Sequence, residues 1–193
     1  MRLTLIFLAC LLGSTALAKQ PVRNISDLYG GQSGLALLRD YDSIRACLLE
    51  PVSGDWNFPP SKYEGYRIRA IADLKEADVK LAATLLRDEA TYDWPDQLQP
   101  DGTTVTKDSR CRPFYHVRLE LRRDADVLAV NFCFFCPGVL VARNDKEVQS
   151  ALLGPRSPEL LALLARVFPR DQLLKTAVSR LNAKPTADQP GHP

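Results

Sequence analysis

Two alternating segments, residues 115–122 and 128–134, constrain the fold more than any other part of the chain. In each segment every second residue is apolar, which is typical of a β-strand with one face on a hydrophobic core. A short turn around Asp124 and Ala125 separates them. The sequence therefore predicts a β-hairpin.

The turn also sets the register of this hairpin. It pairs Val117 with Phe132 and Arg118 with Asn131, so the apolar side chains of both strands share one face. A shift of one residue would bury the arginines instead. We therefore expect the apolar set in the core and the polar set, which includes His116, in water.

The N-terminus predicts a targeting segment. Arg2 precedes an apolar run, and a small-x-small motif ends at Ala18, which is typical of a signal peptide spanning residues 1–18. The apolar run is shorter than the roughly 20 residues that cross a bilayer. We expect an exported chain, periplasmic or secreted, without stable membrane insertion. A lipoprotein acylated at Cys10 is the alternative.

The mature chain has little net charge. Removal of the signal peptide takes away Arg2 and no acidic residue, so the formal charge falls from +2 to +1. Nucleic-acid partners call for clustered positive charge, so none is expected. A protein or a small ligand is the expected kind of partner. The length suits a single domain over residues 19–183, and the Pro-containing, polar tail 184–193 is expected to be disordered.

Three of the four cysteines that remain after export lie on the predicted hairpin. Cys111 precedes its first strand, and Cys133 and Cys136 end its second strand as Cys-Phe-Phe-Cys-Pro-Gly. In the predicted register Cys133 lies opposite His116 on the outer face. Cys111 and Cys136 share the other face as diagonal neighbours, which meet after a small backbone adjustment.

This cluster supports three interpretations. Cysteines close together in an exported protein usually form structural disulfides, and Cys111 with Cys136 is the preferred pair. Cys47, in a predicted strand, supplies a second bond or stays a buried thiol, since four cysteines allow three complete pairings. This interpretation makes the protein a binding or structural protein rather than an enzyme, and it requires no cofactor.

The second interpretation is a zinc site. Cys111, His116, Cys133 and Cys136 have a C-x4-H-x16-C-x2-C spacing, and a Cys-x-x-Cys turn can direct two sulfurs at a tetrahedral ion. The third is thiol redox chemistry at Cys133 and Cys136. A redox thiolate usually lies at a helix N-terminus, whereas Cys133 follows a strand. His116 is the only credible general base, because His192 lies in the tail.

The rest of the chain predicts an α+β fold. It is a small, mostly antiparallel sheet that includes the Cys-bearing hairpin, with about three helices packed on one face, in the order β, β, α, β, β, β, α, α. A helical turn is expected at 35–38 and a polar loop at 96–109. The other strands are expected at residues 43–49, 66–71 and 139–142.

The three helices are expected at residues 74–90, 157–168 and 171–182. A capping box of Asp73 and Glu76 would begin the first, and Ser157 would cap the second. The apolar stripes of the two C-terminal helices are expected to pack on the inner face of the sheet.

The C-terminal half resembles a group of uncharacterised bacterial exported proteins. They share a cysteine, an Asp-Val strand, a Cys-Phe-x-Cys and a helix that ends in Phe-Pro, which correspond here to Cys111, Asp126-Val127, Cys133 to Cys136 and Phe168-Pro169. The resemblance implies that the three hairpin cysteines are a shared feature. It implies no activity. Pro137-Gly138, directly after Cys136, departs from that pattern, in which a polar residue is expected.

Overall fold

The computed structural model describes residues 24–54, 65–94, 96–98, 104–106 and 114–182. The signal peptide at 1–18, the tail at 184–193 and Cys111 lie outside these residues, so those predictions stay predictions. Among the described residues, no helix has the length and apolar character needed to cross a membrane.

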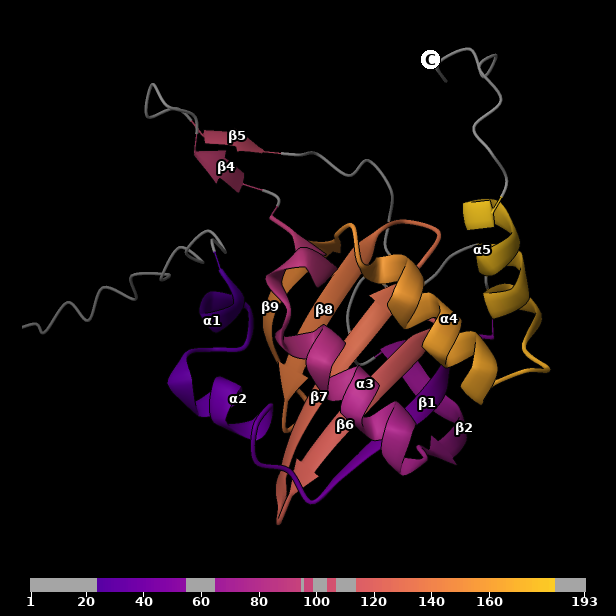
Figure 1. The fold of residues 1–193 in the computed structure, drawn as a ribbon, viewed down its shortest axis with the longest axis horizontal. Coiled ribbons are helices and arrows are strands. Elements are labelled where there is room, and N and C mark those ends of the chain that lie inside the picture. Colours follow the sequence, from indigo (N-terminus) through magenta and orange to yellow (C-terminus); the bar gives the residue numbers. More distant parts are fainter. Residues whose placement is uncertain (1–23, 55–64, 95, 99–103, 107–113, 183–193) are drawn as a thin grey trace, which may run out of the picture.

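A seven-stranded antiparallel sheet forms the centre of the fold (Figure 1). Its spatial order is β2-β1-β6-β7-β8-β9-β3. The strands are β1 Ser43–Pro51, β2 Tyr66–Asp73, β3 Tyr92–Asp93, β6 Val117–Arg123, β7 Asp126–Cys133, β8 Gly138–Arg143 and β9 Lys146–Leu153. This confirms the predicted α+β class.

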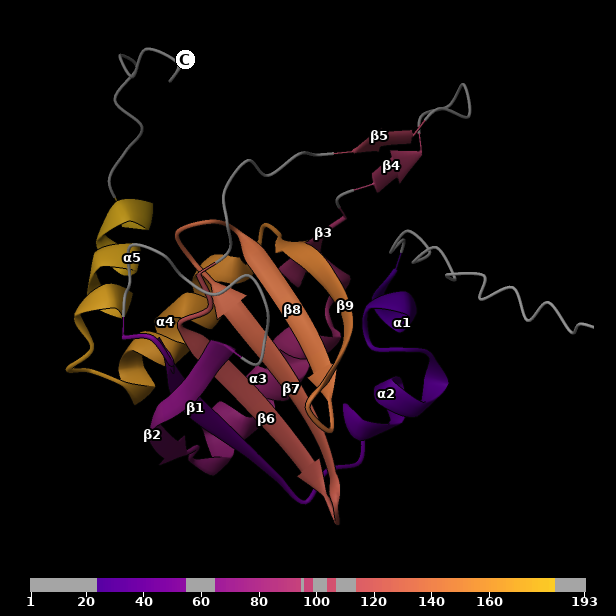
Figure 2. The ribbon, with the colours of Figure 1, turned by 180° about the vertical axis from the view of Figure 1, so that it is seen from behind.

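Two of the helices cover one face of this sheet. The helices are α1 Ile25–Leu28, α2 Gln32–Leu37, α3 Glu76–Arg87, the 3-10 turn η2 Glu89–Thr91, α4 Ser157–Val167 and α5 Gln172–Asn182. Figure 1 shows α3 and α4 in front of the sheet, and Figure 2 shows the bare strands from behind. Leucines of α3 and α4 join Val117, Leu119 and Phe132 in the main core.

The predicted hairpin register is confirmed. Val117 pairs with Phe132 and Arg118 with Asn131, and the two-residue turn falls between the paired Arg123 and Asp126. Val117 and Phe132 are fully buried. The apolar face therefore packs against the helices as the alternation predicts.

The expectation that the polar face meets water is wrong. Arg118, Glu120 and Asn131 are buried, because they bond to one another: Arg118 Nε donates to Asn131 Oδ1 at 2.9 Å and Arg118 Nη1 to Glu120 Oε1 at 3.3 Å. A second apolar cluster covers the same face. Its members are Leu49, Tyr66, Tyr115, Ala129, Cys133, Cys136, Leu140 and Ala142.

Several element boundaries also differ from the predictions. Helix α3 begins at Glu76 after Lys75, with no side-chain cap, because Asp73 still belongs to β2; the predicted capping box is wrong. The predicted order of elements also lacks strand β9 and the short strand β3. Within the predicted loop at 96–109, Asp96–Leu98 (β4) and Thr104–Thr106 (β5) form a separate two-stranded sheet.

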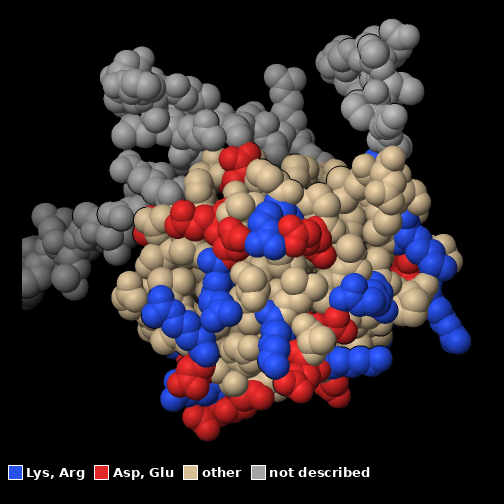
Figure 3. Space-filling model, viewed as in Figure 1, with Lys and Arg blue, Asp and Glu red and all other residues tan. Residues whose placement is uncertain are grey.

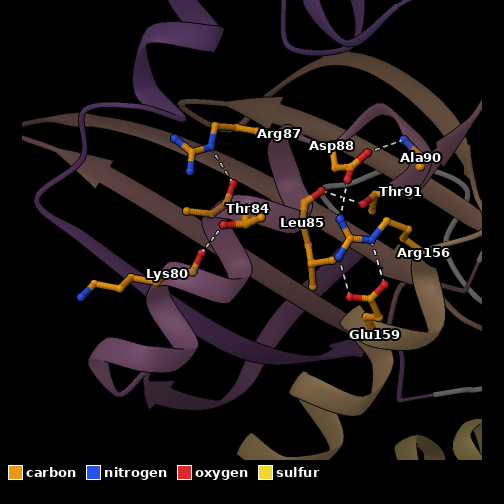
Figure 4. Close-up of polar contacts among 10 residues, drawn as sticks. Lys80, Thr84, Leu85, Arg87, Asp88, Ala90, Thr91, Arg156 and Glu159 are labelled. Atoms are coloured by element: carbon orange, nitrogen blue, oxygen red, sulfur yellow. Dashed lines mark hydrogen bonds and ion pairs between the residues drawn. The ribbon is translucent and has the colours of Figure 1, made fainter.

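Ion pairs, rather than the predicted Ser157 cap, tie the start of α4 to the end of α3. Arg156 is the N-cap residue and makes no side-chain cap bond. Its guanidinium binds Glu159 and Asp88, and Asp88 accepts the N–H of Ala90 at 2.9 Å (Figure 4). Figure 3 shows that basic and acidic side chains are interleaved over this helical face.

Candidate functional site

Asp171, in the turn between α4 and α5, organises the candidate site. Its Oδ1 accepts the N–H of Leu174 at 2.9 Å, which caps the first turn of α5, and also bonds His116 Nε2 at 2.8 Å. Its Oδ2 accepts from Arg69 Nη2 at 2.5 Å. The Asp171 side chain is 5% exposed, so these donors replace water around a buried carboxylate.

A β-bulge brings Arg69 to this carboxylate. Leu48 pairs with Ala70 and Leu49 with Ile68, so Arg69 is the extra residue on β2. A bulge re-aims the side chain that it carries. Arg69 lies 102 residues before Asp171 in the chain, and the bulge turns it toward the α4–α5 turn.

Backbone and ring contacts fix His116 just before β6. Its N–H donates to Phe132 O at 3.0 Å, and its carbonyl accepts the N–H of Leu49 at 2.8 Å. The imidazole stacks on Phe114 with 6.1 Å between ring centroids. His116 is 2% exposed, so the expectation of a solvated histidine is wrong.

The site holds a neutral imidazole beside an ionised carboxylate. Burial lowers the pKa of His116, and this outweighs the raising effect of Asp171. Burial alone would raise the pKa of Asp171, but the bonds from Leu174, His116 and Arg69 together hold it below its usual value. His116 Nε2–H therefore donates to Asp171 at neutral pH.

Acidification is expected to destabilise the protein through His116. Its pKa in the folded state lies below the value near 6.5 of an unfolded chain, so the unfolded state binds more protons as the pH falls through that value. The free energy of unfolding, measured in urea, should thus be lower at pH 5.5 than at pH 7.5. His116→Gln should flatten this difference, and His192→Gln should leave it. Higher stability at pH 5.5 would contradict the neutral form.

A pocket of about 640 Å³ opens beside the His116–Asp171 pair. A smaller hollow of about 330 Å³ adjoins it and shares Arg69, Arg170 and Asp171. The larger pocket is lined by Arg69, Phe114, Phe135, Arg170, Asp171, Gln172 and Leu173. A pocket with apolar walls and a few convergent polar groups is the usual form of a small-molecule site.

Two cysteines lie next to the pocket in the chain, because Phe135, which lines the pocket, stands between Cys133 and Cys136. Cys133 carries a free, fully buried thiol whose Sγ accepts the N–H of Cys136 at 3.1 Å. Burial raises the pKa of Cys133, which is the opposite of what a redox thiolate needs. Cys136 is not a free thiol, and its partner lies outside the described residues.

Cys47 is a buried free thiol on the polar face, opposite Arg118. Burial, the largest effect, raises its pKa to about 11. The described part of the chain contains no group of three or more metal-ligating side chains. Of the zinc candidates, His116 uses Nε2 to bond Asp171, and Cys111 lies outside the described residues.

Comparisons with protein-family models, with curated proteins and with solved structures find no match for this chain.

Sequence reasoning found His116 and the hairpin cysteines but missed most of the pocket. Asp171 was predicted only as the start of a helix. A capping pattern at this position could have indicated that its side chain accepts the N–H of Leu174. Arg69 lay within the predicted strand 66–71, and nothing in that strand pattern marked it as a site residue. Phe135 was noted only as a residue between two cysteines.

Proposed function

We propose that this is an exported binding protein and that the pocket beside the His116–Asp171 pair holds a small molecule. The pocket itself carries this proposal. Its apolar walls, Phe114 and Phe135, come from the start of the first hairpin strand and the end of the second, which lie side by side at the open end of the hairpin. Asp171 is held by three donors. Such prior ordering lowers the entropic cost of binding.

The proposed disulfide between Cys111 and Cys136 fits this role. Cys111 precedes Phe114 by three residues, and Cys136 directly follows Phe135. The bond would therefore tie together the two segments that carry the aromatic walls. Cleavage after Ala18 is part of the same proposal, since a disulfide persists in an oxidising compartment; N-terminal sequencing of the exported chain should then begin at Lys19.

Non-reducing peptide mapping and metal analysis of the same sample separate this proposal from the zinc and redox alternatives. A Cys111–Cys136 peptide without zinc supports it. Near-stoichiometric zinc with free thiols would favour the metal site, and a readily cycling Cys133–Cys136 bond would favour redox chemistry.

The uncharged fluorophore N-phenyl-1-naphthylamine tests the pocket directly. Its emission should rise on binding to the folded protein, because apolar walls exclude water from the probe. Phe135→Ala removes one wall and should weaken binding about tenfold, the scale of a lost aromatic contact. Ile71→Ala removes an exposed apolar side chain from β2 and serves as the matched control. An equal loss in both variants, or no binding at all, would overturn the pocket proposal.

A further inference from the structure

Positive charge exceeds negative charge around the pocket. The carboxylate of Asp171 is fully engaged by the backbone, His116 and Arg69. Arg69 uses only Nη2 for this bond, and within the described part of the chain its Nε and Nη1 bond to nothing. These two nitrogens remain as donors for a ligand.

Arg170 supplies a second cation. It lines both the pocket and the adjoining hollow, it is exposed, and no described residue forms an ion pair or hydrogen bond with its side chain. Arg180 lies over the Phe135 ring with 5.0 Å between its guanidinium carbon and the ring centroid. Two guanidinium groups and a single carboxylate therefore line the pocket, and a third guanidinium lies over one of its aromatic walls.

The walls between these cations are apolar. Phe114 and Phe135 are half-buried, and Leu173 adds an aliphatic surface from the first turn of α5. An inorganic anion would leave these surfaces without a partner. A ligand with a flat apolar body would cover them, and aromatic pairs add to the gain from burial.

We propose that the pocket binds a small organic acid, with its anionic head between Arg69 and Arg170 and its apolar or aromatic body against Phe114 and Phe135. This inference rests on the proposed binding function and names its ligand class. A carboxylate suits the planar fork of a guanidinium, which can donate two parallel hydrogen bonds. Asp171 keeps Arg69 extended toward the site and neutralises only one of the cations.

A matched pair of competitors tests the charge requirement. 1-Naphthoate and 1-naphthamide have nearly the same shape and differ in the charge of the head. Each would displace bound N-phenyl-1-naphthylamine from the full mature chain. Naphthoate should bind about tenfold tighter than the amide, the scale of a charge-assisted bond, and raising the salt concentration should weaken naphthoate alone. 1-Naphthyl phosphate extends the series to a second anionic head.

Arg170→Ala should reduce the preference for naphthoate to less than about threefold, because the arginine with no other partner is lost. It should weaken binding of the uncharged N-phenyl-1-naphthylamine less than binding of naphthoate, because only naphthoate has a negative charge to lose a partner. Arg123→Ala removes the same charge at the β6–β7 turn, at the other end of the sheet, and should keep the full preference. Arg69 is a poorer test, since its loss also exposes Asp171.

The outcomes separate the two proposals. Probe binding with equal affinity for naphthoate and naphthamide would overturn the organic-acid inference and leave the pocket proposal standing. An equal effect of Arg170→Ala and Arg123→Ala would overturn it too, because the preference would then reflect overall charge. A stronger preference for naphthyl phosphate that also depends on Arg170 would support it and select the head group. No binding of any probe would overturn both proposals.

Discussion

Val117→Asp should lower the free energy of unfolding by at least about 4 kcal/mol or prevent folding, because it places a carboxyl without a partner in the core. Val117 is fully buried in β6, between Leu48 of β1 and Phe132 of β7. Urea denaturation followed by circular dichroism measures the change.

Two variants serve as controls. One measures the effect of losing the Val117 side chain without a new charge, and the other measures the effect of a change at the neighbouring position of the same strand. Val117→Ala removes apolar contacts without adding a charge, and should cost about 1–2.5 kcal/mol. Arg118→Ala changes the next residue, on the opposite face, and should cost about 1–3 kcal/mol because Asn131 and Glu120 lose a buried donor. If Val117→Asp cost no more than Val117→Ala, the inner face would be misassigned.

Glu120→Ala should cost about 3 kcal/mol, because it removes the anion shared by three arginines on the other face of the sheet. The Glu120 carboxylate lies 2.7 Å from Arg45, 3.1 Å from Arg122 and 3.3 Å from Arg118. Burial would raise the pKa of Glu120, but these arginines together hold it below its usual value. Denaturant titration at neutral pH measures the loss.

Most of the stability lost in Glu120→Ala should come from leaving the buried Arg118 cation without this carboxylate. The Arg118 side chain is 7% exposed, whereas Arg45 and Arg122 retain access to water. Glu120→Gln keeps the shape and one acceptor, and should fall between the wild type and Glu120→Ala. Glu76→Ala breaks the exposed pair with Lys80 and should cost less than about 0.5 kcal/mol. Equal losses at Glu120 and Glu76 would mean that the buried network adds no stability.

The sequence predicted the hairpin well because the period of a strand and a two-residue turn leave one acceptable register. It could not predict that the polar face would also be buried. Alternation shows which side chains share a face, but the mutual bonds of Arg118, Asn131 and Glu120 appear only when the strands pair. Strand β9 was missed because Lys146–Leu153 lies near the edge and has no strict alternation.

The candidate site was harder to predict, because it joins residues far apart in the chain. No sequence pattern announces the bulge that turns Arg69 toward Asp171. His116 was found as the only histidine outside the tail. Its environment was misjudged, since a place on the polar side of a strand says nothing of the α4–α5 turn that closes over it.

The bulge at Arg69 has a consequence for the solubility of the protein. Strand β2 ends the order of the described sheet, and an open edge of regular strand is a template for pairing with another chain. Ile68 and Ile71 are exposed there, which would favour such contacts. The extra residue falls between them, so an incoming straight strand would lose its hydrogen-bonding register after a few residues. The irregularity that orders the pocket thus also discourages growth of the sheet into aggregates.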